Sequence, residues 1–304
     1  MEKNENKSGG IHKLTVGDIV FYFLLYLFML IFCIVTVYPV VNTLAISFND
    51  GVDAMRGGVH LWPRLFTTQN YSVVLALRSI GRGAVISVLR TVLGTLFAVA
   101  ANALLAFIVS QKNFIFRSQL SLFWVITMYV NGGMIPIMLL YRNLHLTNSF
   151  WVYVIPGMIS GFNMLVMRTY MEGLPDSLQE AAQIDGAGYM KIFVSVVSPL
   201  CKPIYATIAL FVAVGQWNSW FDTMLYNRMA DQYTTLQYEL MKMLSAVTSL
   251  KGNAGAATTG TSVNITPISV RAAATIITMA PIVMLYPFLQ RYFVTGLTIG
   301  GVKE

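Results

Sequence analysis

The chain alternates long apolar stretches with shorter polar ones. A membrane's hydrocarbon core of about 30 Å is crossed by a helix of about 20 apolar residues, and six stretches come near that length or exceed it. Prolines inside several of them are typical of helices packed in a membrane bundle. The pattern predicts an all-α membrane protein with six transmembrane helices at residues 19–47, 84–109, 120–141, 150–167, 203–224 and 272–293.

The segments outside these spans differ in length and polarity. Residues 1–18 form a polar tail, and the apolar run after it is too long for a cleaved signal peptide, whose apolar region has about 7–15 residues, so we expect it to stay as a membrane anchor. The remaining five spans form a core over residues 84–295. The other segments are the long loops 48–83 and 225–270, the polar and helical-looking residues 172–199, and the C-terminal tail 296–304.

Charge in the short loops sets the expected orientation. An even number of spans places both termini on one side, and Lys112 and Arg117 in one short loop add to the three lysines of the N-terminal tail. By the positive-inside rule, this distribution favours cytoplasmic termini. Residues 172–199 are then cytoplasmic, and the two long loops are extracellular.

Composition narrows the class of protein. The chain is 56% hydrophobic and only 11% charged, whereas a soluble domain carries about a quarter charged residues. Its net charge of +7 does not indicate nucleic-acid binding, because the basic residues are scattered among apolar stretches and form no stripe. Cys33 and Cys201 lie in or beside apolar stretches without C-x-x-C spacing, so we expect buried thiols.

Several kinds of chemistry are missing from the sequence. No lysine follows a glycine, so the chain has no P-loop to hold the phosphates of ATP. Asp222 is the one candidate carboxylate inside a span, which disfavours a proton relay. The histidines all fall in tails or loops and give no catalytic or metal-binding cluster. We therefore expect no catalytic residue, metal or cofactor on this chain.

Residues 172–199 carry the most specific pattern. Ser177 and Glu180 have the spacing of a helix capping box, with Pro175 just outside the helix. Gly186 is expected to end that helix, and a second short helix over 189–197 is expected to stop at Pro199. Periodicity alone is equally satisfied by an amphipathic helix pair lying at the membrane interface.

The spelling of this segment resembles the EAA loop of the permeases of bacterial ABC importers. Glu180-Ala181-Ala182 is followed after two residues by Asp185-Gly186-Ala187 and later by Phe193 and Pro199, with a departure at Ser198, where leucine is common. The resemblance implies the type I ABC importer permease fold, in which this loop fits a socket on a separate ATPase. It assigns ATPase coupling to Glu180, Ala181, Ala182, Asp185 and Gly186.

These residues would have different tasks in that contact. The resemblance implies that Glu180 meets polar or basic groups of the ATPase and that the two alanines permit close approach. Gly186 would supply the bend between two coupling helices, because glycine adopts left-handed backbone angles without steric cost. A role of Glu180 as a helix cap is the alternative, and both roles can coexist.

Two more stretches resemble the carbohydrate-uptake branch of this family. Residues 216–222 and 288–297 are similar to the second permease of oligosaccharide systems such as the maltose system. The resemblance implies a second homologous permease, two ATPase subunits that bind ATP and Mg, an extracellular sugar-binding protein and surrounding lipid. It also implies that an outer loop within 225–270 reaches into the binding protein, although its glycines equally suit a plain linker, and that residues 298–304 insert between the ATPase subunits.

Candidate sugar contacts lie mainly in the fifth span. At 100° per residue, Trp217, Trp220 and Phe221 share one arc of a helix, while Asn218 and Asp222 lie opposite. Aromatic faces combined with hydrogen-bonding groups suit sugars, although an aromatic belt at the end of a span explains the tryptophans equally well. Two buried amides, those of Asn131 and Asn163, either line the same path or bond across helices.

These observations predict the permease subunit of an ATP-driven ABC importer that carries an oligosaccharide across the bacterial cytoplasmic membrane. The chain is not expected to be an enzyme by itself, because ATP hydrolysis belongs to the partner subunit. The alternatives are a stand-alone secondary carrier of a polar solute and a membrane scaffold that transports nothing.

Overall fold

The computed structural model describes residues 15–252 and 265–296, and the regular elements within them are helices. One isolated bridge joins Asn49 and Phe66 in these residues. Short elements are the 3-10 helices η1 (Phe150–Tyr153) and η3 (Asp231–Tyr233) and the π-helix η2 (Phe193–Val197). The α-helices are α1 (Val16–Ser47), α2 (Gly51–Met55), α3 (Gln69–Ala76), α4 (Arg78–Ser110), α5 (Arg117–Tyr129), α6 (Met134–Asn143), α7 (Gly161–Glu172), α8 (Asp176–Ile184), α9 (Tyr189–Ile192), α10 (Ser198–Leu200), α11 (Lys202–Asn218), α12 (Phe221–Tyr226), α13 (Leu236–Gly252) and α14 (Pro267–Gly296).

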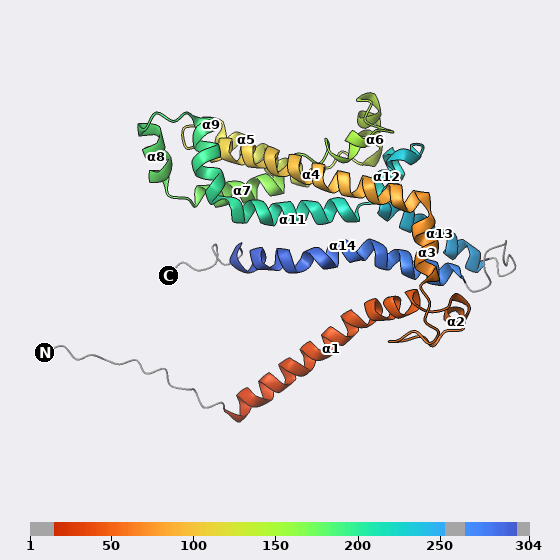
Figure 1. Cartoon of the computed structure of the whole chain (residues 1–304). Coiled ribbons are helices and arrows are strands. Elements are labelled where there is room, and N and C mark those ends of the chain that lie inside the picture. The colour runs from red at the N-terminus through yellow and green to blue at the C-terminus, as the bar shows by residue number, and fades with distance from the viewer. Residues whose placement is uncertain (1–14, 253–264, 297–304) are drawn as a thin grey trace.

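Helix α4 is the centre of the bundle. It packs along α7 and α11, and Figure 1 shows α4, α11 and α14 running side by side. Its buried face recurs every three or four residues and includes Gly94, Ala98 and Asn102. A Cβ atom at Gly94 would lie 2.8 Å from Nε2 of Gln216, so a side chain at this position would displace the Gln216 amide. Small residues on this face therefore let α11 approach α4 closely.

Two core clusters hold the bundle together. The first joins α4, α7, α11 and the α9–η2 segment through residues such as Phe107, Met164, Ile192 and Ile208. The second joins α3, α4, α11, α13 and α14, and it includes Trp217. Both clusters are built mainly from methionine, aliphatic and aromatic side chains, which fill irregular gaps between helices.

Helix α1 diverges from this bundle. It contacts α14, and Figure 1 shows that it lies nearest the bundle at its C-terminal end and diverges from it towards its N-terminus. Its buried residues are Ala45 and Ser47, while its apolar side chains from Val16 to Val40 are exposed around the whole helix. A helix that is apolar all round is stable where lipid or another protein covers it, so α1 has the surface of a membrane anchor.

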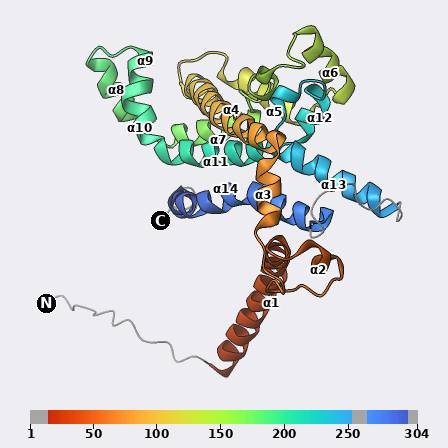
Figure 2. The ribbon, with the colours of Figure 1, turned by 45° about the vertical axis from the view of Figure 1, so that its right-hand side comes forward.

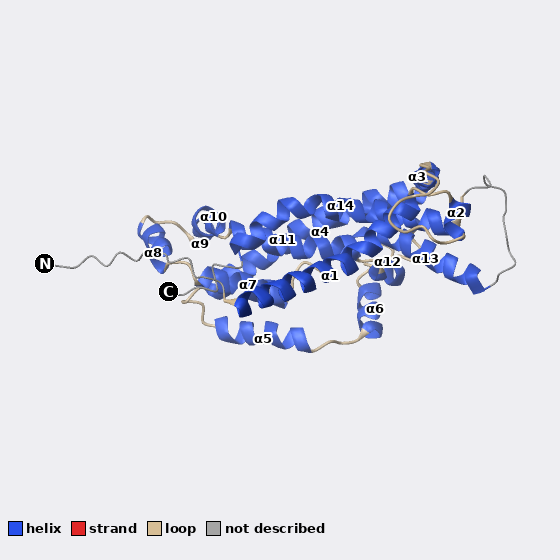
Figure 3. Ribbon diagram, turned by 90° about the horizontal axis from the view of Figure 1, so that it is seen from below, coloured by secondary structure: helices blue, strands red, loops and turns tan. Residues whose placement is uncertain are grey.

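The two ends of the bundle carry different elements. One end, called the α8 end, carries α8 and α9 together with the start of α1 and the last turns of α14 (Figure 1, Figure 2). The other, called the α12 end, carries α2, α3, α6, α12 and α13 (Figure 1, Figure 3). The segments expected on opposite sides of a membrane are 172–199 on one side and 48–83 with 225–270 on the other. Their described residues, which for the last segment are 225–252 and 265–270, therefore lie at opposite ends.

The candidate spans in the structure are not six continuous helices. In the described residues, α1, α4 and α14 are long and apolar enough to cross a membrane, and the total rises to five if each of two bent helix pairs counts as one span. The pair α5 and α6 bends by 115°, and the run of residues 189–200 bends by 80° against α11. The predicted span 120–141 is thus interrupted, because Gly133 with φ 85° breaks the helix. The six-span count stays a prediction.

The prediction of a continuous helix over 150–167 is wrong. Only η1 and the first part of α7 are helical there, and α7 begins after Ser160, whose hydroxyl accepts from the amide of Asn163. Pro156 disfavours helix for the residue before it. The Asn102 amide donates to the Met158 carbonyl at 3.0 Å and accepts from the Ser160 amide at 3.0 Å. A buried side chain of α4 thereby satisfies backbone groups that a helix would otherwise have paired.

The segment 225–270 is not a plain loop. It contains η3 and α13, and α13 packs against α4 and α14. The interpretation as a glycine-rich linker applies at most beyond α13, which reaches Gly252. Gly255 and Gly260 lie outside the described residues, as do 298–304, for which an insertion between ATPase subunits was expected.

Candidate functional site

The first candidate site is helix α8, which carries the Glu-Ala-Ala spelling. It begins at Asp176 with Pro175 as its N-cap, and no side chain bonds to the first-turn amides. The predicted capping box of Ser177 and Glu180 is therefore wrong. Ser177 is the second residue of the helix, so it lies past the N-cap position from which its hydroxyl would accept from the first-turn amides.

Gly186 ends α8, as its sequence position predicts. It has φ +78°, its amide donates to the carbonyl of Gln183 at 3.0 Å, and the amide of Ala187 donates to the carbonyl of Ala182 at 2.9 Å. These two bonds form a Schellman motif, in which the first residue after the C-cap is left-handed. Ala182 and Ala187 both pack against the first core cluster, so the motif also anchors the end of α8 to the bundle.

The second helix of the loop runs further than the sequence predicts. The helical run passes from α9 through η2 into α10, so Pro199 does not stop it. The Ser198 amide donates to the carbonyl of Phe193, five residues earlier. This wider turn leaves room for the ring of Pro199, which in a regular α-helix would clash with the carbonyl four residues before it.

The α8–α9 segment presents an exposed surface. Glu180, Ala181 and Asp185 are exposed, whereas Ala182 turns towards the bundle. Apolar side chains stand beside them: Ile184 is 87% exposed and Met190 is 62% exposed. Apolar residues gathered at the tip of an otherwise polar segment are typical of a protein contact. Four of the five proposed coupling residues, Glu180, Ala181, Asp185 and Gly186, therefore lie on this surface. The fifth, Ala182, packs against the first core cluster.

Two polar contacts fasten α8 to the end of α4. Nε2 of Gln111 donates to Oε1 of Gln179 at 3.2 Å, and Lys112 forms an ion pair with Asp176. Gln111 is the C-cap of α4, and Lys112 follows it. Because the ion pair is exposed, it contributes little to stability. Its position nevertheless ties the first turn of α8 to the residues that follow α4.

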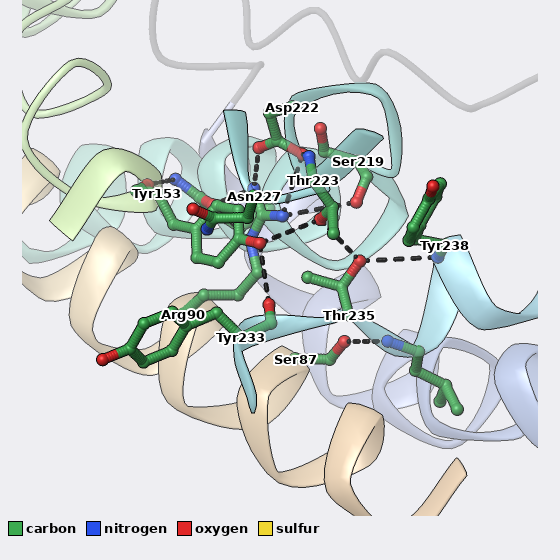
Figure 4. A network of polar contacts seen from close by, with 12 residues as sticks. Ser87, Arg90, Tyr153, Ser219, Asp222, Thr223, Asn227, Tyr233, Thr235 and Tyr238 are labelled. Atoms are coloured by element: carbon green, nitrogen blue, oxygen red, sulfur yellow. Dashed lines mark hydrogen bonds and ion pairs between the residues drawn. The ribbon is translucent and has the colours of Figure 1, made fainter. Parts of the chain in front are cut away.

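The second candidate site is a polar network at the α12 end, centred on Arg90 (Figure 4). The guanidinium of Arg90 bonds to both carboxylate oxygens of Asp222, at 3.1 Å through Nη1 and 2.5 Å through Nη2. Nε and Nη2 also donate to Oε1 of Gln216, at 3.0 Å and 2.8 Å, and Nη1 donates to the Ser219 carbonyl at 3.3 Å. The charge lies 4.3 Å from the ring centroid of Tyr153. Arg90 is therefore paired, stacked and only 2% exposed.

The network continues into neighbouring segments. The Tyr153 hydroxyl donates to the Tyr233 carbonyl at 2.7 Å and lies 3.1 Å from the hydroxyl of Thr223, which in turn lies 2.9 Å from that of Thr235 (Figure 4). Ser87 of α4 accepts from the amide of Leu236 at 2.9 Å. These contacts join α4, η1, α12, η3 and the start of α13. A cavity of about 410 Å³ lies beside them, lined by Arg90, Tyr141, Tyr153, Gln216, Asp222 and Tyr226 among others.

The six predicted sugar contacts do not share one surface. Helix α11 ends at Asn218, Ser219 is extended with ψ 124°, and a new helix begins at Phe221. The arc worked out for a continuous helix is therefore wrong. Trp217 is buried in the second core cluster, where its Nε1 donates to the Thr278 carbonyl at 3.0 Å.

The other candidates lie apart from Trp217. Trp220 is partly buried and meets Phe221 edge to face at 5.8 Å, Asn218 is exposed, and Asp222 is paired with Arg90. Asn131 lies between α5 and α6, where its side chain accepts from the Gly133 amide, and Asn163 lies in the first turn of α7. Sequence reasoning missed Arg90, Gln216 and Tyr153. The available signal was an arginine within an apolar stretch, which normally has a buried partner.

Comparison with known proteins places these segments in context. The model of the protein family described as "Binding-protein-dependent transport system inner membrane component" matches residues 91–299, which include α8, α11 and α12. The chain is 30% identical over 280 residues to the polygalacturonan/rhamnogalacturonan transport system permease protein YtcP of Bacillus subtilis, with 92% of this chain and 97% of that protein covered.

Two further proteins extend the comparison. The chain is 28% identical over 277 residues to the arabinooligosaccharides transport system permease protein AraQ of Halalkalibacterium halodurans, with 88% of this chain and 92% of that protein covered. Among solved structures, a chain of a bacterial ABC transporter involved in the import of the acidic polysaccharide alginate superposes with a TM-score of 0.82 at 26% identity, covering 92% of this chain and 98% of that one.

Proposed function

Because the chain belongs to the family of binding-protein-dependent transport system inner membrane components, we propose that it is the permease subunit of an ATP-driven ABC importer whose cargo is an oligosaccharide. The proteins to which it is similar over almost their whole length are named as permeases for polymeric or oligomeric sugars. The solved structure with the same fold comes from an importer of a polysaccharide. The cavity beside Arg90 has a volume within the range of about 300–1,000 Å³ typical of small-molecule sites.

The α8–α9 segment is the ATPase contact in this proposal. The observation that carries it is a helix pair bearing the Glu-Ala-Ala spelling, fixed by the Schellman motif at Gly186, that presents Ile184 and Glu180 outwards. Ile184 is the last residue of α8, is 87% exposed and directly precedes the C-cap and the Schellman turn, so its side chain is available to a protein partner. The partner set is a second homologous permease, two ATPase subunits and an extracellular sugar-binding protein.

Orientation follows from that contact. ATP is a cytoplasmic fuel, so the α8 end faces the cytoplasm and the α12 end faces outwards. The chain enters α1 and reaches the end of α14 at the α8 end (Figure 1), which supports cytoplasmic termini. The exposed Asn218 and the partly buried Trp220, at the break between α11 and α12, remain our proposed sugar contacts on the outer side.

Copurification with the ATPase tests this function. The permease, its partner permease and the ATPase subunits are coexpressed, solubilised and reconstituted, and ATP hydrolysis is measured with and without sugar-loaded binding protein. Glu180→Ala should assemble in the membrane normally, because Glu180 has no capping role in the structure, yet lose ATPase binding or stimulation. Asp231→Ala is the matched control, since it removes an exposed carboxylate at the opposite end. A wild-type permease that transports sugar without any ATPase would instead identify a secondary carrier.

A further inference from the structure

Arg90 has no hydrogen-bonding capacity left for a substrate. A guanidinium carries five N–H donors. All five are engaged, by Oε1 of Gln216 twice, by the two oxygens of Asp222 and by the Ser219 carbonyl. Its open face is covered by the ring of Tyr153. A buried arginine beside a sugar-sized cavity suggests recognition of an acidic sugar, but these contacts leave it no donor for a carboxylate.

The partners of Arg90 all lie where the backbone departs from regular helix. Gln216 is in the last turn of α11, Ser219 is in the break that follows, and Asp222 is in the first turn of α12. Tyr153 ends η1, and its carbonyl accepts from Nε2 of Gln216 at 3.0 Å. Irregular backbone in a membrane bundle needs such polar partners. Arg90 thus fixes the α11–α12 break and the η1 turn against α4.

Helix α4 connects this network to the ATPase contact. It runs without interruption from Arg78 to Ser110, and the 21 positions between Arg90 and Gln111 span about 30 Å at 1.5 Å per residue. At its inner end, Gln111 and Lys112 hold Gln179 and Asp176 of α8. At its outer part, Arg90 and Ser87 hold α12 and the start of α13. Helix α4 therefore contacts the first turn of α8 at one end and both α12 and the start of α13 at the other.

We propose that Arg90 is a positioning residue that fastens the outer part of α4 to the α11–α12 break, so that movement of α8 is passed through α4 to the segments that receive the sugar. This inference rests on the proposed function. The buried ion pair is suited to the task because its forked geometry fixes orientation as well as distance. Arg90 acts through Asp222, Gln216 and Tyr153 and does not contact the sugar.

The test is a set of variants in the reconstituted four-component complex. Arg90→Met removes the bonds and leaves the carboxylate of Asp222 without its partner, but that side chain is 23% exposed and water can hydrate it. The complex should therefore assemble and hydrolyse ATP, while stimulation by sugar-loaded binding protein should fall about tenfold. The loss should appear in the maximal stimulated rate, with half-saturation by loaded binding protein within about twofold of wild type, because no substrate contact is removed. Arg82→Met is the control, since it makes the same change at an exposed position of α4.

A second pair of variants separates positioning from simple packing. Asp222→Asn leaves the charge of Arg90 buried and poorly paired, so the yield of complex should fall. The double variant Arg90→Met with Asp222→Asn should recover that yield without recovering stimulation. Should Arg90→Met fail to assemble, Arg90→Lys decides the matter: it keeps the charge but loses the fork, and we expect assembly with reduced stimulation.

The outcomes are distinguishable from failure of the proposed function. Stimulation of the wild-type complex establishes that function in the same assay. Wild-type stimulation in assembled Arg90→Met or Arg90→Lys would overturn the positioning role and leave the function intact. A defect confined to uronate-containing oligosaccharides, with neutral ones spared, would overturn it too, because that is the signature of an arginine that binds the sugar.

Discussion

Gly186→Val should uncouple the permease from its ATPase through the backbone alone. A Cβ atom at Gly186 would meet nothing within 4 Å, so the substitution causes no collision. Its φ of +78° lies in the left-handed region, which costs a residue with a side chain about 1–2 kcal/mol and a β-branched residue more. A free-energy change of about 1–2 kcal/mol shifts an equilibrium by a factor of about 5–30. The native turn would therefore lose its dominance over other conformations.

The consequences of that shift are local. If the backbone at Gly186 leaves the left-handed region, the bonds from Gly186 to Gln183 and from Ala187 to Ala182 are lost. The surface formed by Glu180 and Ile184 is then no longer held relative to α9. The bundle itself should be unaffected, because its core clusters do not include Gly186.

The assay is copurification of the ATPase with solubilised permease, normalised to the amount of permease in the membrane. Gly186→Asn should retain most binding, since asparagine tolerates left-handed angles. Gly188→Thr provides the β-branched control: φ at Gly188 is −72°, its surroundings are equally open, and threonine is an acceptable N-cap for α9. Binding by Gly186→Val equal to that of Gly188→Thr would refute the reasoning from backbone strain.

Three further predictions concern other parts of the molecule. Trp217→Ala should lower the thermal stability and yield of the permease, because Trp217 is buried and truncating a core tryptophan costs about 3–5 kcal/mol. Trp220→Ala should assemble normally and lower sugar uptake. Equal yields and equal uptake of the two variants would contradict this division. With Cys33 and Cys201 replaced by alanine, single cysteines at Ile184, 87% exposed, and Met229, 90% exposed, should react with an impermeant maleimide from opposite sides of the membrane, and labelling from one side would refute the orientation. The hydrogen bond from Asn49, together with Arg64, holds the pKa of Asp53 below its ordinary value of 3.8. The contribution of the Asp53 carboxylate to stability is therefore present above pH 3.8 and is lost as the pH falls further. Hydrogen exchange of residues 49–66 should show this loss in the wild type and not in Asp53→Asn.

The class of the protein and the turn at the end of α8 could be predicted from the sequence alone. Long apolar stretches have one stable environment, so membrane residence follows from composition and length alone. The bend at Gly186 could also be predicted, because only glycine adopts left-handed angles freely, and a helix commonly ends at such a residue. These are local properties, fixed by a residue and its near neighbours.

The positions where the helices break and the polar groups that meet there depend on long-range contacts. Periodicity treats residues 203–224 and 150–167 as continuous helices, yet α11 stops at Asn218 and α7 starts only at Gly161. The breaks are stable because Arg90 and Asn102 of α4, far away in sequence, bond to the groups that the breaks expose. The energy that favours them comes from contacts across more than 50 positions, up to 132 for Arg90 and Asp222, and no local pattern records it. For the same reason Asp222 reads as an isolated carboxylate in the sequence but is half of a buried ion pair in the fold.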